Sequence, residues 1–251
     1  MSKPFLVLQL RPEEATAASE LGKICHYGGL AAAEVHRVRL DQEPAPELAL
    51  ADYSAIIVGG SPFDLSAPAA GKSNLQVAIE AFFQRLLDEV VDKDFPFLGC
   101  CSGNGLLGRH LGAGVSKRFG EDVGGVDIEI TAAGREDPLL AGMPAVIRVL
   151  VGHKEACDET PPGSTLLAKG GICPVQMFRV GANVYATQFH PEGDFEGFSV
   201  RIGAYKHHGY FPPAAAAELT DRIRAEHTPE AHEILRRFVA RYRTETTRRG
   251  G

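Results

Sequence analysis

The sequence predicts an α/β protein with an open, mostly parallel central sheet, helices on both faces and a small antiparallel section. Two observations support this fold class. Over the first 112 residues, short apolar segments alternate with helix-forming segments, which is typical of parallel strands joined by helices. Beyond residue 122, strand-like segments follow one another with short polar connections, which is typical of antiparallel neighbours.

The first part of the chain is expected to contain four strands and three helices. Residues 4–10 are mostly apolar, as in a buried strand. Apolar side chains recur at spacings of three and four over 74–91, which predicts an amphipathic helix. The expected elements, in order, are a strand at 4–10, a helix at 12–27, strands at 34–40 and 52–58, a helix at 74–91, a strand at 95–100 and a helix at 103–112.

The second part is expected to contain five strands and two helices. Pro212-Pro213 and Thr228-Pro229 are start signals for the helices. Strands are expected at 123–131, 145–151, 164–169, 174–179 and 183–189, a turn or short helix at 137–140, and helices at about 214–226 and 229–243. We expect a single domain over residues 1–243, in which 214–243 form the C-terminal helices, and a disordered tail over 244–251.

The composition is that of an ordinary soluble globular protein, with 44% hydrophobic and 23% charged residues among 251. A net charge of −6 gives no reason to expect a nucleic-acid or anionic-membrane partner. No apolar segment reaches membrane-spanning length, and the apolar N-terminal run is interrupted too early for a signal peptide. Five cysteines without the density of a disulfide scaffold indicate a reducing, cytoplasmic setting.

Gly99-Cys100-Cys101-Ser102-Gly103 is the most informative motif of the chain, because it has the form G-x-C-x-G. An apolar strand precedes it and a leucine-rich helical segment follows, which is the context of a nucleophile elbow. The glycines allow the close approach that a sharp strand-to-helix turn requires. Cys101 would face the first turn of the helix, where free N–H groups and the helix dipole favour a thiolate. The pattern therefore predicts Cys101 as a nucleophile and Cys100 as a core residue.

A base for this cysteine is predicted at the end of another strand. Residues 185–189 are strand-like, and Pro191 ends the strand directly after His190. Glu192 can reach back to the imidazole, and a carboxylate that accepts from one ring nitrogen fixes the tautomer and stabilises the imidazolium. Cys101, His190 and Glu192 are therefore expected to form a Cys-His-Glu triad.

Together these motifs resemble the triad type of the class I glutamine amidotransferase family, and the resemblance implies the flavodoxin-like fold of that family. It extends over about residues 4–195, and Gln188-Phe-His190-Pro-Glu192 is its most specific element. The resemblance is strongest to free-standing proteins similar to the amidotransferase domain of GMP synthase, a wider group in which some members act on γ-glutamyl peptides. The other matching elements are Gly59-Gly60, Phe97 to Gly103, Leu111-Gly112, Asp122-Val-Gly124, Thr131 to Leu140 and His153-Lys-Glu155.

The resemblance implies amide hydrolysis through a thioester. Cys101 would attack the side-chain carbonyl of glutamine or a γ-glutamyl compound, and His190 would protonate the departing ammonia and then activate water. The backbone N–H groups of Gly60 and Ser102 would meet the developing oxyanion. Gly59 belongs to the same glycine turn and is a candidate for the substrate site.

Two positions depart from the family's pattern. Many members have an aromatic residue directly after the nucleophile and a glutamine three positions later, where this chain has Ser102 and Gly105. That glutamine usually helps to hold the substrate, so its absence leaves the substrate open between free glutamine and a larger γ-glutamyl compound. The alternatives are a γ-glutamyl peptidase without ammonia transfer and a non-catalytic regulatory module of the same fold. Loss of a triad residue would mark the latter, and none is lost.

Other polar residues have weaker functional signals. His153 and Glu155 either shape the pocket or cap a strand. His207 and His208 lack partners at metal-ligand spacing, so they are expected in a solvated loop, and no metal or other cofactor is expected. Residues 61–73, rich in Ser, Pro and Ala, are expected to form a mobile cover over the pocket.

The expected partners follow from the resemblance. A glutamine or γ-glutamyl compound would be the small-molecule substrate. Transfer of the ammonia to a partner is left open by the sequence. If there is such a partner, it is expected to be a separate synthetase subunit, since no synthetase domain follows the matching segment in this chain. A homodimer is compatible with the sequence, and neither nucleic acid nor a membrane is an expected partner.

Overall fold

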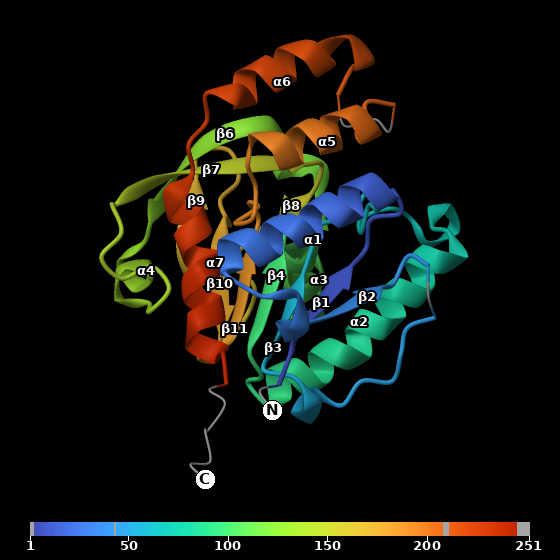
Figure 1. Ribbon diagram of the computed structural model, residues 1–251, viewed down its shortest axis with the longest axis vertical. Helices are drawn as coiled ribbons and strands as arrows, with labels where there is room; N and C mark the ends of the chain where they lie inside the picture. The colour runs from blue at the N-terminus through green and yellow to red at the C-terminus, as the bar shows by residue number, and fades with distance from the viewer. Residues whose placement is uncertain (1–2, 43, 208–210, 245–251) are drawn as a thin grey trace.

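The computed structural model describes residues 3–42, 44–207 and 211–244. They form a nine-stranded sheet with helices on both faces and a separate two-stranded sheet (Figure 1). The strand order is β2-β1-β3-β4-β11-β10-β9-β6-β7. The predicted α/β class is confirmed, whereas the tail predicted at 244–251 lies outside the described residues except for Thr244.

One half of the large sheet is parallel. Each of the pairs β1–β2, β1–β3, β3–β4 and β4–β11 runs in one direction. Every residue of four of these strands is buried, and β2 forms the half-exposed edge. The strands of this half are β1 (Phe5–Gln9), β2 (Val35–Arg39), β3 (Ala55–Val58), β4 (Phe97–Cys100) and β11 (Val184–Thr187).

The other half continues the same sheet with antiparallel pairs, from β11 outwards to β7. Its strands are β10 (Met177–Val180), β9 (Ser164–Gly170), β6 (Glu121–Ile130) and β7 (Val146–His153). The two-stranded sheet pairs β5 (Val115–Ser116) with β8 (Ala156–Cys157). The antiparallel section predicted from the second part of the chain is therefore present and extends the parallel half.

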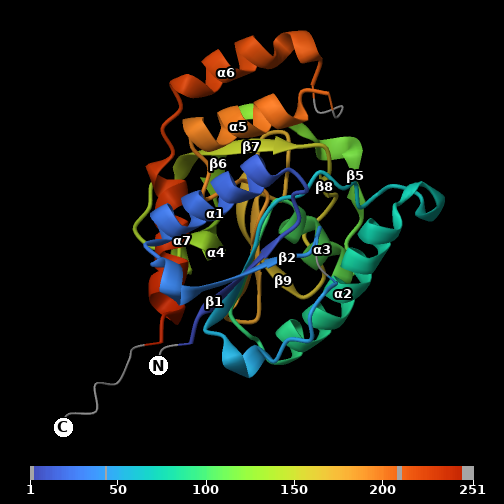
Figure 2. The same ribbon diagram turned by 45° about the vertical axis from the view of Figure 1, so that its right-hand side comes forward.

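Helices cover both faces of the sheet (Figures 1 and 2). Apolar side chains of α1 and α7 share one core cluster with the strands, and those of α2 and α3 share another, which places these two pairs of helices on opposite faces. The helices are α1 (Glu14–Gly28), α2 (Asn74–Asp92), α3 (Ser102–His110), α4 (Ala132–Glu136), α5 (Phe195–Tyr205), α6 (Ala216–Arg224) and α7 (Pro229–Tyr242). Short 3₁₀ turns lie at Ala32–Glu34, Leu50–Asp52, Ala69–Gly71, Lys117–Phe119 and Pro213–Ala215.

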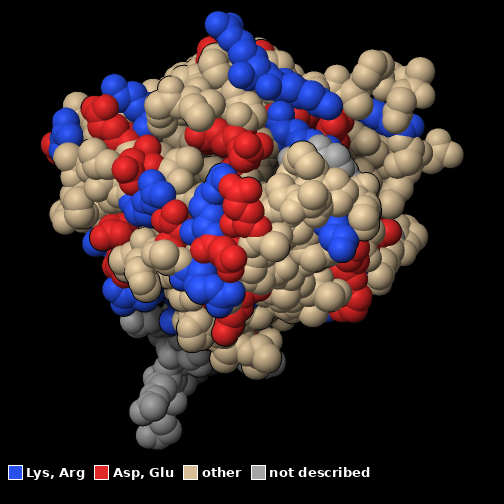
Figure 3. Space-filling model, turned by 90° about the horizontal axis from the view of Figure 1, so that it is seen from above, with Lys and Arg blue, Asp and Glu red and all other residues tan. Residues whose placement is uncertain are grey.

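Helix α5 was not predicted from the sequence pattern, and the short α4 lies just before the turn or short helix predicted at 137–140. Helix α5 packs with α6 over β6 and β7, where Leu150, Phe198 and Ile223 are buried together. On the face above these two helices, acidic and basic side chains are interspersed and neither sign covers the surface (Figure 3). No helix among the described residues combines the length and the apolarity needed to cross a bilayer.

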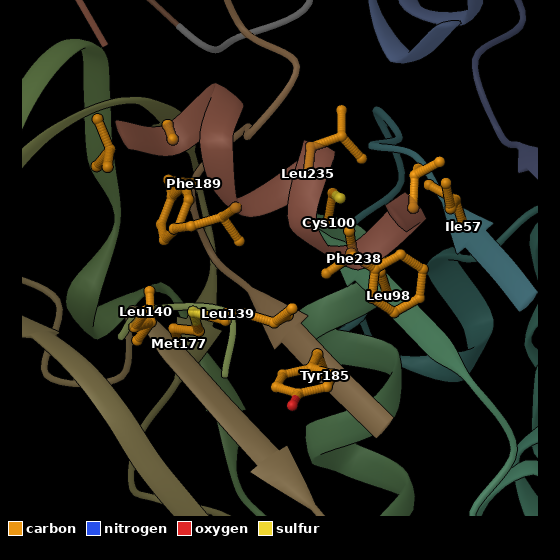
Figure 4. Close-up of a cluster of buried hydrophobic side chains, with 14 of the residues drawn as sticks. Ile57, Leu98, Cys100, Leu139, Leu140, Met177, Tyr185, Phe189, Leu235 and Phe238 are labelled. Atoms are coloured by element: carbon orange, nitrogen blue, oxygen red, sulfur yellow. The ribbon is translucent and has the colours of Figure 1, made fainter. Parts of the chain in front are cut away.

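Cys100 is part of the hydrophobic core, as predicted. Its side chain is 2% exposed, and it belongs to the same buried cluster as Leu98, Leu235 and Phe238. Figure 4 shows its sulfur among these apolar side chains, between the sheet and α7. Burial raises the pKa of the Cys100 thiol well above its usual value, so this cysteine is an unreactive core residue.

The parallel strands end on one edge of the sheet, where three predicted site residues and the unpredicted Arg11 follow the strand ends. Arg11 lies just beyond β1, Gly60 beyond β3, Cys101 directly after β4 and His190 beyond β11. The four strands are neighbours in the sheet. Ligands of open α/β sheets bind outside the carboxyl ends of the strands, so this edge is the candidate site.

Candidate active site

The turn at Cys101 joins β4 to α3 in a strained conformation. Cys101 has φ +53° and ψ −95°, which L residues rarely adopt. A Cβ on Gly99 would lie 2.7 Å from the carbonyl carbon of Gly103, so only glycine fits at position 99 without a backbone shift. The Cys101 N–H donates to Thr187 O at 2.8 Å, which ties the turn to β11. The chain is thus bent sharply at the residue predicted as the nucleophile.

The surroundings of the Cys101 side chain favour the neutral thiol. Burial raises the pKa of Cys101 from 9.0 to about 11, and Glu192 acts in the same direction, although Arg11 and Arg201 oppose the shift. The helix N-terminus alone predicts a thiolate. Desolvation of the sulfur acts against this effect and outweighs the nearby positive charges.

His190 and Glu192 form a buried pair in the turn after β11. Nδ1 of His190 lies 2.8 Å from Glu192 Oε1, and both side chains are at most 3% exposed. A carboxylate at Nδ1 places the ring proton there and leaves the lone pair on Nε2. Burial lowers the pKa of His190 despite the opposing effect of Glu192, so the imidazole is neutral and able to accept a proton.

Arg201, on α5, binds the same carboxylate. Its Nη2 lies 2.6 Å from Glu192 Oε1, the oxygen that also accepts from His190. Burial alone would raise the pKa of Glu192, but His190 and Arg201 hold it well below its usual range. Within the described part of the chain, Arg201 Nη1 and Glu192 Oε2 are buried without a hydrogen-bond partner. Arg201 therefore keeps Glu192 ionised beside the imidazole.

A second buried ion pair lies next to this group. Arg11 Nε donates to Glu20 Oε2 at 2.6 Å, and the two side chains are 5% and 0% exposed. The same Glu20 oxygen accepts from the Gly60 N–H at 3.1 Å and lies 3.8 Å from Arg201 Nη2. Glu20 thus connects α1 to the glycine turn after β3 and to α5.

The two glycines of that turn make room for the ion pair. A Cβ on Gly59 would lie 2.1 Å from Glu20 Oε1. One on Gly60 would lie 2.3 Å from Arg11 Nη2 and 3.0 Å from His190 Cε1, so Gly60 lies beside the imidazole. The Gly60 N–H is engaged by Glu20, and its expected role as an oxyanion donor stays a prediction that requires Glu20 to release it.

The two departures from the family's pattern both contact the segment 61–73. Ser102 Oγ accepts a hydrogen bond from the Ser61 N–H at 2.7 Å. A Cβ on Gly105 would lie only 2.8 Å from Leu65 Cδ1, so the leucine occupies the space that a side chain at 105 would need. Ser102 and Gly105 therefore support the segment predicted as a cover.

His153 ends β7 and is held between two oxygen atoms. Its Nε2 lies 2.9 Å from Glu121 Oε2, and its Nδ1 lies 2.9 Å from Glu155 O. Cys173 joins this group, whose three potential ligand atoms lie within 4.8 Å of one another. Glu121 and the Glu155 carbonyl thereby fix the His153 ring in the wall of the pocket. His153 lines the pocket, and its part in substrate binding stays a prediction.

Two pockets meet at Cys101 and Ser61, which line both. Each encloses about 400 Å³ of space between atoms, with the solvent at its open mouth included. The first, here called the Ser102 pocket, is also lined by Asp64, Leu65, Ser102, Gly105, His153 and Lys154. The second, the His190 pocket, is also lined by Arg11, His190, Phe198, Arg201, Ile202 and Phe211. Cys101 and His190 thus face a common space.

Three charged residues of the site were not predicted from the sequence. Arg11 had a usable signal, because it directly follows a parallel strand at the edge where ligands bind. Glu20 lies within a helix and had no such signal. Arg201 lies on α5, whose helical pattern was missed. Of the other predicted motifs, His208 lies outside the described residues.

A cysteine elbow at the carboxyl edge of a doubly wound sheet, with a paired histidine at the next strand end, defines an amidotransferase-like α/β protein. Residues 18–200 match the family model described as Glutamine amidotransferase class-I. The chain therefore belongs to the class I glutamine amidotransferase family, as its motifs indicated.

Relatives by sequence include GMP synthase subunits. One subunit of the glutamine-hydrolysing GMP synthase of Thermococcus kodakarensis is 34% identical over 108 residues, which cover 43% of this chain and 56% of that protein. The corresponding protein of Methanoregula boonei is 31% identical over 150 residues, covering 59% and 70% of the two chains. The match therefore spans little more than half the length of the Thermococcus relative.

Solved structures share the whole fold. A glutamine amidotransferase from Thermotoga maritima has a TM-score of 0.70 at 21% identity, covering 95% of this chain and 97% of that one. A glutamine amido transferase from Methylobacillus flagellatus has a TM-score of 0.73 at 14% identity, covering all of both chains. At these identities the comparison establishes the fold alone.

Proposed function

We propose that this protein hydrolyses the side-chain amide of glutamine or of a γ-glutamyl compound through a glutamyl thioester on Cys101, releasing glutamate with ammonia or an amine. The observation that carries the proposal is that Cys101, on its strained elbow, lines one pocket with His190, whose Nδ1 is held by Glu192. Membership of the amidotransferase family supports this class of substrate.

The reaction starts from a neutral thiol and a neutral imidazole. His190 Nε2 accepts the Cys101 proton as the sulfur bonds to the γ-carbonyl carbon and the carbonyl π electrons move to oxygen. The C–N bond then breaks and His190 returns the proton to the departing nitrogen. In the second half, His190 takes a proton from water, the hydroxide attacks the thioester, and the C–S bond breaks to give glutamate and the thiol.

The surrounding groups stabilise the charges that develop. Glu192 stabilises the imidazolium, and Arg201 keeps Glu192 ionised. The backbone N–H groups of Ser102 and of the Gly60 turn are the proposed oxyanion donors, each worth ~3 kcal/mol in such sites. Donation by Gly60 requires its hydrogen bond to Glu20 to be exchanged for one to the oxyanion.

A γ-glutamyl peptidase is the second candidate function, and the His190 pocket favours it. The apolar side chains Phe198, Ile202 and Phe211 line this pocket next to the proposed proton donor. An amine leaving group larger than ammonia would find apolar contacts there. The two candidates differ only in the group on the scissile nitrogen.

The relatives suggest a partner. Because similar proteins are named as subunits of GMP synthase, we propose that the ammonia passes to a separate synthetase subunit. Addition of such a subunit should then raise the rate of glutamine hydrolysis. The homodimer stays a prediction.

Glutamate release from L-glutamine and from L-γ-glutamyl-L-leucine tests the proposal. Cys101→Ala and His190→Ala should lower the wild-type rate by about 10³-fold or more. Cys25→Ala, which removes another partly exposed thiol, should leave the rate unchanged. Release from glutamine favours the ammonia donor, and release from the dipeptide alone favours the peptidase. Equal rates for the wild type and Cys101→Ala on both substrates would refute hydrolysis at this cysteine.

A further inference from the structure

The Ser102 pocket carries side chains of opposite charge in its wall. Asp64 Oδ1 pairs with Lys154 Nζ, and Asp64 Oδ2 lies 2.9 Å from Lys117 Nζ. Asp64 and Lys154 line the same pocket as Cys101. Their side chains are 21% and 23% exposed, so a ligand can reach charges that are already largely withdrawn from water.

The Ser102 pocket has no polar side chain at position 105. Gly105 has no side chain, and Leu65 fills the adjoining space. An apolar side chain cannot compensate the charges of an amino-acid end, which would be costly to bury unpaired. Recognition of a charged substrate end therefore needs other residues.

Asp64 is held in position by the packing of its segment. The neighbouring N–H groups of Leu65 and Ser66 donate to the Glu155 carboxylate at 2.6 and 2.9 Å. Gln76 Nε2 donates to Asp64 O at 2.8 Å. These bonds fix the backbone at Asp64, and they engage Glu155 with the segment so that its carboxylate is not the group that meets a ligand.

The α-carbon of a γ-glutamyl compound bears an ammonium and a carboxylate. Burial would raise the pKa of Asp64, but Lys154 and Lys117 lower it, so at neutral pH Asp64 is an anion between two cations. The ammonium can bind Asp64 while the carboxylate takes its place beside a lysine. Each resting ion pair would then be exchanged for an equivalent pair with the ligand, and no charge is left uncompensated.

We infer that Asp64 and Lys154 bind the α-ammonium and the α-carboxylate of a γ-glutamyl substrate and thereby select a free amino-acid end. The inference rests on the proposed function, because it assigns the far end of the substrate cleaved at Cys101. It also separates substrates that share the γ-amide but differ at the α-carbon.

Binding to the Cys101→Ala variant, measured by calorimetry, tests the inference without turnover. The probes are L-glutamine, N-acetyl-L-glutamine and L-glutamine α-methyl ester. Glutamine should bind about tenfold more tightly than either derivative. Adding Asp64→Asn to this variant should lower the affinity for glutamine about tenfold and leave the affinity for N-acetylglutamine unchanged. Adding Lys154→Met should likewise lower the affinity for glutamine and leave the affinity for the methyl ester unchanged.

Matched controls are available on the surface. Asp127 pairs with Arg148, and Lys169 pairs with Glu129, in exposed positions of β6 and β9. Asp127→Asn and Lys169→Met should leave all three affinities unchanged. Far-UV circular dichroism of each variant checks that the fold is retained.

The outcomes separate this inference from the proposed function. The inference is overturned if Asp64→Asn lowers the affinity for all three ligands equally. It is also overturned if glutamine binds no more tightly than its derivatives, or if no probe binds. If the wild-type protein hydrolyses glutamine and its two derivatives equally well, the proposed function is supported and the inference about Asp64 and Lys154 is refuted. If the wild-type protein hydrolyses none of the three compounds but Cys101→Ala binds glutamine with the expected preference, the proposed function is refuted and the assigned binding site is supported.

Discussion

The backbone N–H of Gly60 donates a hydrogen bond to Glu20 Oε2 at 3.1 Å, so a fully buried carboxylate from α1 holds the turn that follows β3. The same oxygen accepts from Arg11 and lies near Arg201, which binds Glu192. One chain of buried charges therefore links the glycine turn to the His–Glu pair. Substitutions within it should affect both stability and chemistry.

Replacement of Glu20 by glutamine should destabilise the protein. Glu20→Gln leaves Arg11 buried without its counter-charge, which in comparable pairs costs about 3 kcal/mol or more. The free energy of unfolding in urea measures the loss. The double variant Arg11→Met with Glu20→Gln should recover much of it, because no unpaired charge remains. A single-variant loss below about 1 kcal/mol would contradict the assigned burial of this pair.

Replacement of Arg201 should shift the pH dependence of activity. Burial and Arg201 both lower the pKa of His190. Without the guanidinium, this pKa rises, and the protonated, inactive imidazole persists to higher pH. The acid limb of kcat/KM should therefore move to higher pH in Arg201→Gln, with kcat lowered about tenfold or more.

Arg222→Gln serves as its control, since Arg222 forms an exposed pair with Glu218 on α6. The control should keep the wild-type profile. An unchanged acid limb in Arg201→Gln would mean that Arg201 has only a structural role.

The Cys101 thiol should titrate well above an ordinary cysteine. Burial raises its pKa from 9.0 to about 11, so the reactive thiolate forms only at high pH. The rate of Cys101 alkylation by iodoacetamide, read by peptide mass spectrometry, should rise with a midpoint near pH 11. A midpoint below pH 8 would show a resting thiolate instead. The free energy of unfolding should also fall between about pH 9 and 11, where the unfolded thiol has lost a proton that the folded one retains.

Two glycines with opposite surroundings test the geometry of the elbow. An added Cβ at Gly99 meets the backbone of Gly103, whereas nothing lies within 4 Å of one at Gly22 in α1. Gly99→Ala should cost about 2 kcal/mol or more, because backbone cannot move aside as a side chain can. Gly22→Ala should gain about 0.5 kcal/mol from helix propensity. Thermal unfolding of both variants gives the comparison, and equal midpoints would argue against the tight elbow.

The fold was largely predictable because its signals are local. The apolar run of β1 and the spacing of three and four in α2 determine the element type within a short window. The elbow was predictable for the same reason, since Gly99 and Gly103 lie in one motif. Helix α5 was missed because glycines at 197 and 203 and Ser199 weaken its helix propensity; its burial against α6 compensates.

The charges around the site were not predictable, because they depend on contacts between distant segments. Glu20 binds the Gly60 N–H although the two residues are 40 positions apart in the sequence. The ion pair between Arg11 and Glu20 is recognisable only from the packing of α1 against the end of β1. Leu65 at Gly105 is another contact of this kind. The effect of burial on the Cys101 thiol was also not predictable, because a motif shows the helix terminus but not the desolvation of the sulfur.

The measurement that tests the central claim most directly is intact-mass analysis of the protein quenched with acid during turnover of L-glutamine or L-γ-glutamyl-L-leucine. A glutamyl adduct on Cys101 in the wild type, absent from Cys101→Ala, is the predicted result. Glutamate release by Cys101→Ala at the wild-type rate, or an adduct that maps to another residue, would contradict it.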